Sequence, residues 1–153
     1  MRLILANAVM LVLAATGCGS DTAPTTSAPE LPSLTGIWTG DVSVEGTPAR
    51  MTWTLTQRDT SVTGPVLVVL PTGTVLLNGM LSGTLSATTV AYVIAVSPDG
   101  IPSQPACTGQ LAGSVTTMIS TRSASTLVGT YSVSSSTCRT ALSSGTFTLT
   151  RSS

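Results

Sequence analysis

The chain has 153 residues, a formal net charge of zero, 8% charged residues and 3% aromatic residues, which is enough sequence for one small domain. It contains no His and no Lys, and this excludes imidazole acid–base catalysis, Schiff-base chemistry and metal sites built from His. The six positive charges are all Arg, lie apart from one another and are offset by six carboxylates, so no basic patch indicates a nucleic-acid partner.

The N-terminal segment has the pattern of a targeting signal. Arg2 precedes an apolar run from Leu3 to Ala15, which is too short for a transmembrane helix of about 20 apolar residues. The stretch Ala15-Thr16-Gly17-Cys18 resembles the bacterial lipobox. That resemblance implies removal of residues 1–17 as a signal peptide and lipidation of Cys18, with its freed amine often acylated too. Because Ala15 stands where Leu is commonest, ordinary signal cleavage nearby is the alternative.

The residues after Cys18 bear on location and on spacing. Gly19 and Ser20 lack the Asp that retains many lipoproteins at the inner membrane of two-membrane bacteria, so the resemblance favours the outer membrane there. In an organism with one membrane, the protein would lie on its outer face. Residues 18–33 are rich in Pro, Ser, Thr and Ala, and we expect a flexible tether that reaches up to about 45 Å.

From Leu34 onward, short segments rich in Thr, Val, Ser and Leu alternate with Gly, Pro or Asp at even spacing. Met51, Trp53 and Leu55 alternate with Thr, which is typical of a sheet with one face in water. The eight predicted strands are approximately Gly36–Val44, Ala49–Gln57, Ser61–Val69, Thr74–Ser82, Thr88–Val96, Thr108–Met118, Leu127–Ser134 and Gly145–Arg151. Short connections favour an all-β domain over residues 34–153, an antiparallel up-and-down eight-stranded barrel, because closure removes both sheet edges. An open sandwich is the competing architecture.

Two positions carry a family resemblance. Gly36-Ile37-Trp38 at the head of the first strand is similar to the Gly-x-Trp signature of lipocalins and their calycin relatives. In those families the Trp lies across the closed end of the barrel and an Arg or Lys from the last strand packs on its ring. The resemblance implies that Trp38 and Arg151 form this pair, with a cation–π contact of about 0.5–2 kcal/mol.

The cysteines indicate one bridge. If Cys18 is lipidated, Cys107 and Cys138 are an even pair in an oxidising compartment, and a disulfide between them could contribute roughly 3–4 kcal/mol. In the predicted barrel both lie at the rim opposite Trp38, where a bridge would tie the connections Ser97–Ala106 and Ser135–Ser144 together. Two buried free thiols are the alternative.

Strand parity predicts which side chains face the interior. Trp53, Tyr92, Tyr131 and Phe147 are the candidates for lining a cavity, and further inward-facing residues are Met51, Leu55, Val90, Ile94, Leu127 and Leu149. Large side chains are few, so the interior could be under-filled. A binding barrel would need an apolar cavity of about 300 Å³ or more that opens on the Ser97–Ala106 side. Close packing by small residues is the alternative. Glycines within Gly79–Gly83 and Gly109–Gly113 are expected to mark bulges or tight barrel corners.

Catalytic chemistry finds little support. Without His or Lys, the general base for a Ser or Thr nucleophile would have to be Asp41, Glu45, Asp59 or Asp99, and three of these lie at predicted turns. No Asp-x-Asp-x-Asp-Gly spacing indicates a calcium site. We expect no enzyme activity, no cofactor and no metal.

The sequence therefore predicts a membrane-anchored envelope lipoprotein, held by its N-terminal lipid, whose lipocalin-like barrel binds a small apolar ligand. The alternative is a non-catalytic interaction or assembly protein, or an inhibitor, with a filled barrel that contacts another envelope protein.

Overall fold

The structure is a computed structural model that describes residues 31–44, 46–120, 123–138 and 144–152. The described strands are β1 (Gly36–Val44), β2 (Thr47–Arg58), β3 (Ser61–Val69), β4 (Val75–Ser86), β5 (Thr89–Val96), β6 (Gly109–Ser120), β7 (Ser123–Ser136) and β8 (Gly145–Arg151). Within those ranges, no helix is long and apolar enough to cross a membrane. The predicted signal peptide, Cys18 and most of the predicted tether lie outside the described residues.

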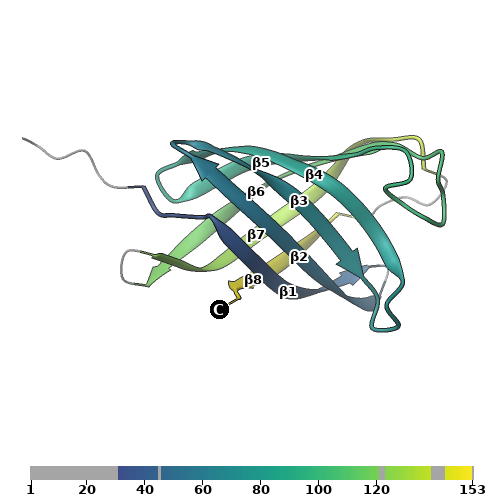
Figure 1. Cartoon of the computed structure of the whole chain (residues 1–153), viewed down its shortest axis with the longest axis horizontal. Helices are drawn as coiled ribbons and strands as arrows, with labels where there is room; N and C mark the ends of the chain where they lie inside the picture. Colours follow the sequence, from purple (N-terminus) through teal and green to yellow (C-terminus); the bar gives the residue numbers. More distant parts are fainter. Residues whose placement is uncertain (1–30, 45, 121–122, 139–143, 153) are drawn as a thin grey trace, which may run out of the picture.

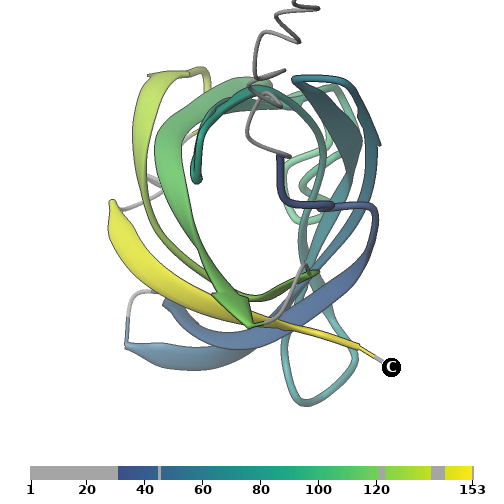
Figure 2. The ribbon, with the colours of Figure 1, turned by 90° about the vertical axis from the view of Figure 1, so that its left-hand side faces the viewer.

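The eight strands form one closed barrel in which each strand pairs antiparallel with the next and β8 pairs with β1 (Figure 1). Figure 2 views the barrel from the end at which the described chain begins and shows the strands as a ring. The predicted all-β, up-and-down barrel is confirmed, and the open sandwich is wrong. Closure rests on a short β1–β8 ladder that pairs Trp38 with Arg151 and Thr39 with Thr150.

Three strands, β1, β3 and β8, have the predicted bounds, and the others run longer than predicted or begin a residue away. β4 continues through Gly83 to Ser86, and β7 extends to Ser123 and Ser136. These extensions contain Gly83 and several Ser residues, which do not favour strands in isolation, although the Thr residues among them do. They stay extended because the neighbouring strands supply hydrogen-bonding partners along their length.

Alternation of side chains separates an apolar interior from a polar outer face. In β5, Val90, Tyr92, Ile94 and Val96 are buried, while the residues between them are exposed. The abundant Thr residues follow the same rule, since nearly all of those in strands lie on the outer face. Thr117 is the exception among the described residues, because it is buried. The barrel core is therefore built from one side of every strand.

Inward-facing aromatic rings lie across glycines of the neighbouring strand. A Cβ atom at Gly113 would lie 2.8 Å from the Tyr92 hydroxyl, and one at Gly145 would lie 2.7 Å from the Tyr131 hydroxyl. The bulge expectation holds only near Gln110, where the β6–β7 register shifts, because the ladders through Gly79–Gly83 are unbroken. Gly113 and Gly145 therefore provide room for tyrosine rings rather than barrel corners.

One end of the barrel is closed by Trp38. Its side chain is fully buried, and its Nε1–H donates a hydrogen bond to the carbonyl oxygen of Leu34 at 2.8 Å. The Cζ atom of Arg151 lies 4.6 Å from the centre of the Trp38 ring. The ring is thus held between the residues that precede β1 and the guanidinium at the end of β8.

Arg151 also fixes the segment that leads into the barrel. Its guanidinium donates to the carbonyl oxygens of Thr35 at 2.6 Å and Ser33 at 2.5 Å, and its Nε–H donates to that of Ala124 at 3.2 Å. Leu31 packs against the core, although it precedes residue 34, where the domain was expected to begin. The last residues of the predicted tether therefore belong to the packed structure.

The opposite rim carries the disulfide. Cys107 in the β5–β6 connection is bonded to Cys138 in the β7–β8 connection, with their Cα atoms 4.8 Å apart. Thr108 and Thr137 support the bridge, because each backbone N–H donates to the other residue, at 2.9 Å in both cases. The predicted bridge is confirmed, and the free-thiol alternative is wrong. Two long connections are thereby tied at the end of the barrel far from Trp38 (Figure 1).

Candidate functional site

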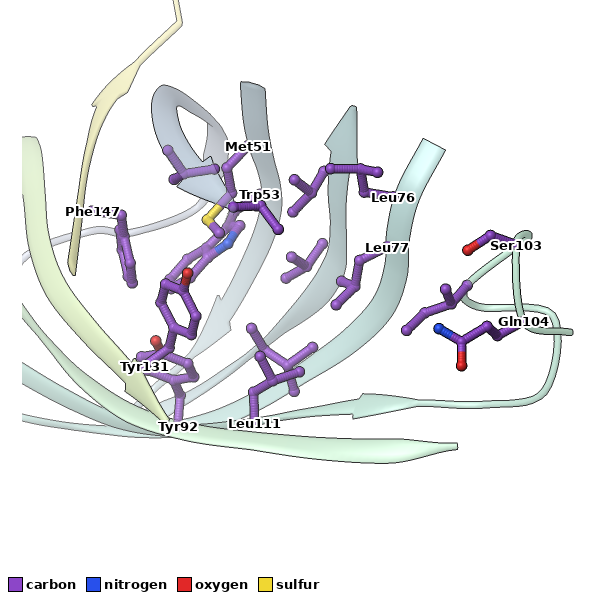
Figure 3. Close-up of a pocket in the computed structure, with 16 residues that line it drawn as sticks. Met51, Trp53, Leu76, Leu77, Tyr92, Ser103, Gln104, Leu111, Tyr131 and Phe147 are labelled. Carbon is purple, nitrogen blue, oxygen red and sulfur yellow. The ribbon is translucent and has the colours of Figure 1, made fainter. Parts of the chain in front are cut away.

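The half of the barrel opposite Trp38 contains an apolar cavity of about 170 Å³. Every strand contributes at least one side chain to its wall, and the β5–β6 connection covers part of its mouth (Figure 3). The lining residues are Val42, Val44, Met51, Trp53, Val66, Val68, Leu76, Leu77, Tyr92, Ile94, Ile101, Ser103, Gln104, Leu111, Tyr131 and Phe147.

Three aromatic rings form the floor of this cavity. The centre of the Trp53 ring lies 5.1 Å from that of Tyr92 and 5.0 Å from that of Phe147. The next inward-facing residues toward the closed end, Leu55 on β2 and Leu149 on β8, are buried but do not line the cavity. The cavity therefore ends at the aromatic floor, and buried side chains of the closed half lie beneath it.

The mouth is bordered by a structured connection between β5 and β6. Ile101 from this connection is buried at 5% exposure and points its side chain into the cavity wall, whereas Ser103 is exposed. The Gln104 N–H donates to the Ile101 carbonyl at 2.8 Å, and the Cys107 N–H donates to the Gln104 carbonyl at 2.9 Å. The Asn78 N–H donates to the Gly100 carbonyl at 2.7 Å, which ties the connection to β4. The mouth therefore has a fixed wall on this side.

The four residues predicted to line a cavity, Trp53, Tyr92, Tyr131 and Phe147, all lie on its wall (Figure 3). Trp38 and Arg151 lie together at the opposite end, and Cys107 and Cys138 lie at the mouth rim. The further inward-facing residues are buried, but they divide between the cavity and the packed half.

The predicted lining omitted side chains near the mouth. Leu76 lies in strand β4 next to Leu77, which also lines the cavity, so strict alternation does not hold there, and Ile101 follows a Pro-Asp-Gly turn in the β5–β6 connection. Their signal was the presence of large apolar side chains next to turn residues. Both side chains line the mouth half of the cavity.

The cavity is smaller than the 300 Å³ or more that the sequence led us to expect, because its volume is about 170 Å³. The difference has two physical causes. The closed half is filled by side chains such as Leu81, Leu85 and Leu127, each at most 1% exposed. In the open half, Leu77 and Ile101 extend into space that a wider barrel mouth would leave empty.

Tyr92 has a buried hydroxyl with a fixed role. Its O–H donates to the carbonyl oxygen of Thr130 at 2.8 Å, across the gap that Gly113 leaves. Burial, with a smaller contribution from Tyr131, raises the pKa of the Tyr92 phenol well above its ordinary value. The phenol is therefore neutral throughout the physiological pH range, and its hydrogen-bonding capacity as a donor is already used.

Trp53 has a buried donor without a partner. Its side chain is 1% exposed, and its Nε1–H makes no hydrogen bond within the part of the chain that the structure describes. The Nε1–H of Trp38, the other tryptophan, donates to the Leu34 carbonyl. In Figure 3 the Trp53 nitrogen lies on the side of its ring away from Phe147, toward the cavity.

The charged side chains that the structure describes lie away from the cavity. Asp41, Asp59 and Asp99 are exposed, and Asp41 forms a 3.9 Å surface ion pair with Arg50. Glu45 lies outside the described residues. Among the described residues, no group of three His, Cys, Asp or Glu side chains could hold a metal ion. The cavity wall therefore offers apolar surface, two phenols and one indole N–H, together with the polar side chains of Ser103 and Gln104 at its mouth.

The candidate site is thus an apolar cavity above an aromatic floor, which can take up a small molecule by burial of apolar surface. No protein-family model matches the chain, and neither a curated protein nor a solved structure matches it.

Proposed function

We propose that the protein is a lipid-anchored binding protein of the cell envelope, and that its barrel holds one small, mainly apolar molecule without catalysing a reaction. The observation that carries the proposal is the apolar cavity of about 170 Å³ above Trp53, Tyr92 and Phe147. This volume is below the roughly 300 Å³ that a larger, drug-sized ligand requires, but an apolar cavity of about 150 Å³ is large enough for benzene. The ligand therefore has about six to eight non-hydrogen atoms.

The size of the ligand sets the expected affinity. At about 0.8 kcal/mol for each of about seven non-hydrogen atoms, binding would contribute about 5.5 kcal/mol, which corresponds to a dissociation constant of about 0.1 mM. Such a ligand exchanges rapidly, which suits a protein that senses or passes on a small molecule rather than storing it.

The anchor and the barrel family are part of the same proposal. Lipidation of Cys18 is supported by its resemblance to the lipobox, and a lipocalin-like relationship is supported by the contact between Trp38 and Arg151 at the closed end. Arg151 holds Ser33 and Thr35 at that end, opposite the mouth. A chain that continues from there to a membrane-bound Cys18 leaves the mouth free for a ligand.

A pair of neighbouring substitutions on β3 tests the proposal. Val68 lines the cavity and is 4% exposed, whereas Leu67 faces outward and is 36% exposed. We expect V68W to occupy part of the cavity and to weaken binding of benzene and cyclohexanone at least about tenfold. The matched control L67W places the same ring outside the barrel and should bind both probes like the wild type.

Two outcomes would contradict the proposal. Equal binding by folded V68W and the wild type would show that the probes bind outside the cavity. If the wild-type protein binds neither probe up to about 10 mM, far above the expected dissociation constant, the binding function is wrong. The interaction-protein alternative would then replace it.

A further inference from the structure

We infer that the ligand of the cavity is a neutral molecule with one hydrogen-bond acceptor, and that the Nε1–H of Trp53 donates to this acceptor. The inference rests on the proposed binding function and extends it to the chemical class of the ligand. It follows from one unpartnered donor, from its place in the cavity and from the charge of the cavity wall.

The donor is unusual because buried polar groups in folded proteins almost always have partners. Trp53 is 1% exposed, and its Nε1–H has no partner among the described residues. Two comparable donors in the barrel are satisfied, since Trp38 at the closed end donates to the Leu34 carbonyl and Tyr92 donates to the Thr130 carbonyl, both at 2.8 Å. The Thr117 hydroxyl is also buried without a partner among the described residues, but Thr117 does not line the cavity. A buried tryptophan N–H ordinarily finds an acceptor. A ligand can supply the acceptor that the chain does not.

The donor lies where the deepest part of a ligand would be. Trp53 belongs to the aromatic floor, and in Figure 3 its nitrogen is on the ring edge that faces away from Phe147. A molecule that enters past Ser103 and Gln104 would reach this edge with the group that leads into the cavity. The acceptor therefore sits at the inner end of the ligand, and its apolar body contacts side chains such as Leu77 and Leu111.

The wall also determines the charge of the ligand. Among the residues that the structure describes, none of those lining the cavity is Arg, Asp or Glu, so the described wall offers an ionised ligand no opposite charge. Transfer of an unpaired carboxylate or ammonium into such a cavity is strongly unfavourable. A pure hydrocarbon would fit, but it would leave the Trp53 N–H unsatisfied. A neutral ketone, ester or lactone meets both conditions.

The missing hydrogen-bond partner of Trp53 has a competing explanation, which is a contact between its Nε1–H and the face of a neighbouring aromatic ring. The Trp53 and Tyr92 rings meet at 71° and the Trp53 and Phe147 rings at 58°, which are angles at which an N–H can point at a ring face. In that case the Trp53 Nε1–H would not donate a hydrogen bond to a ligand. The experiment below separates the two explanations.

The experiment uses three probes of related shape on the wild-type protein and on W53F. Cyclohexanone and methylenecyclohexane differ only by exchange of the carbonyl oxygen for a CH₂ group, and cyclohexanecarboxylate adds a charge. In wild-type protein we expect cyclohexanone to shift the Trp53 Nε1–H NMR resonance downfield while the Trp38 resonance stays in place. Methylenecyclohexane should bind without this downfield shift, and cyclohexanecarboxylate should not bind measurably.

The W53F variant keeps an aromatic ring and removes the N–H. We expect it to weaken cyclohexanone binding about fivefold to tenfold more than it weakens methylenecyclohexane binding, because both probes lose the same ring contacts and only the ketone loses a hydrogen bond. Each probe is compared with itself in the two proteins, so the difference in hydration between cyclohexanone and methylenecyclohexane cancels. If W53F does not fold, the indole resonance of the wild-type protein decides the question alone.

The outcomes distinguish this inference from the proposed function. Binding of both neutral probes with no change specific to the ketone would overturn the role of Trp53 and leave the binding function intact. Tight binding of cyclohexanecarboxylate would overturn the neutral character of the ligand. Failure of all three probes to bind would refute the binding function itself.

Discussion

Arg151 offers the sharpest test of how the barrel is closed. It packs on Trp38, holds the segment before β1 through Ser33 and Thr35, and contacts the carbonyl of Ala124 near the start of β7. The substitution R151M keeps an apolar stem of similar length against the Trp38 ring, but removes the charge and the donors. The closed end then loses the group that joins the Trp38 ring, the segment before β1 and the start of β7.

The expected loss follows from these contacts. The cation–π contact of a half-buried Arg contributes about 1 kcal/mol. Three hydrogen bonds to carbonyl oxygens contribute about 0.5–1 kcal/mol each, and two of them are exposed. Because the Met stem retains most of the packing, we expect the free energy of unfolding to fall by about 2–4 kcal/mol. For a domain of this size the melting temperature would fall by roughly 10 °C.

Urea unfolding followed by tryptophan fluorescence measures this change, with R50M as the matched control. Arg50 lies on the outer face, is 64% exposed and forms a 3.9 Å ion pair with Asp41. Such an exposed pair contributes about 0.5 kcal/mol or less. A loss for R151M no larger than that for R50M would refute the role of Arg151 in closure.

Three further predictions concern the barrel interior and the anchor. G113A places a Cβ atom 2.0 Å from the carbonyl oxygen of Thr130 and should lower the free energy of unfolding by more than about 3 kcal/mol. The control G109A has its nearest contact at 3.2 Å and should lower it by less than about 1 kcal/mol. Equal losses in urea titrations would contradict the spatial role of Gly113. Because the pKa of Tyr92 is raised in the folded state, the folded protein retains a proton that the unfolded chain loses above about pH 10, so the contribution of Tyr92 to stability should be constant below that pH and fall by up to about 1.4 kcal/mol per pH unit above it. Y92F should remove this slope in pH-dependent unfolding, and an unchanged slope would assign it to another group. C18A should abolish incorporation of radiolabelled palmitate and release the protein from the membrane fraction; persistent labelling would place the lipid elsewhere.

The strand order could be predicted because alternation of side chains is a local pattern. The residues at the closed end could be predicted because a short motif at the start of β1 and one residue at the end of β8 indicate them. Alternation of Thr with apolar side chains marks the strands, and the outward Thr residues follow directly from it. The pair of Trp38 and Arg151 was implied by the resemblance to the lipocalin signature, and an up-and-down barrel allows it because its first and last strands meet at the same end. The same topology predicts Cys107 and Cys138 at one rim.

The cavity was less predictable, because its shape depends on side chains that meet across the barrel. The sequence identified Trp53, Tyr92, Tyr131 and Phe147 as inward-facing, but not the packing that fills the closed half. Ile101 lies in a connection without periodicity, so nothing local indicates that its side chain turns inward. The volume of about 170 Å³ results from these non-local contacts.

Pairing register explains two other failures of prediction. Gly113 lies opposite Tyr92 on one side and Tyr131 on the other, which only the assembled ladder reveals. The prediction of irregular backbone holds near Gln110, but at Gly113 the strands are paired regularly and the glycine provides room for a ring. The missing partner of the Trp53 N–H is equally non-local, since it depends on what eight strands bring to the centre of the barrel.

The binding function is tested most directly by intermolecular nuclear Overhauser effects between bound cyclohexanone and the methyl groups of the protein. The account predicts contacts from the ligand to Leu77, Ile94 and Leu111, which line the cavity. Outward-facing Val93 and Val128, 36% and 40% exposed, should show none. Contacts confined to the outward-facing methyl groups, or none to any protein methyl group at saturating ligand, would contradict it.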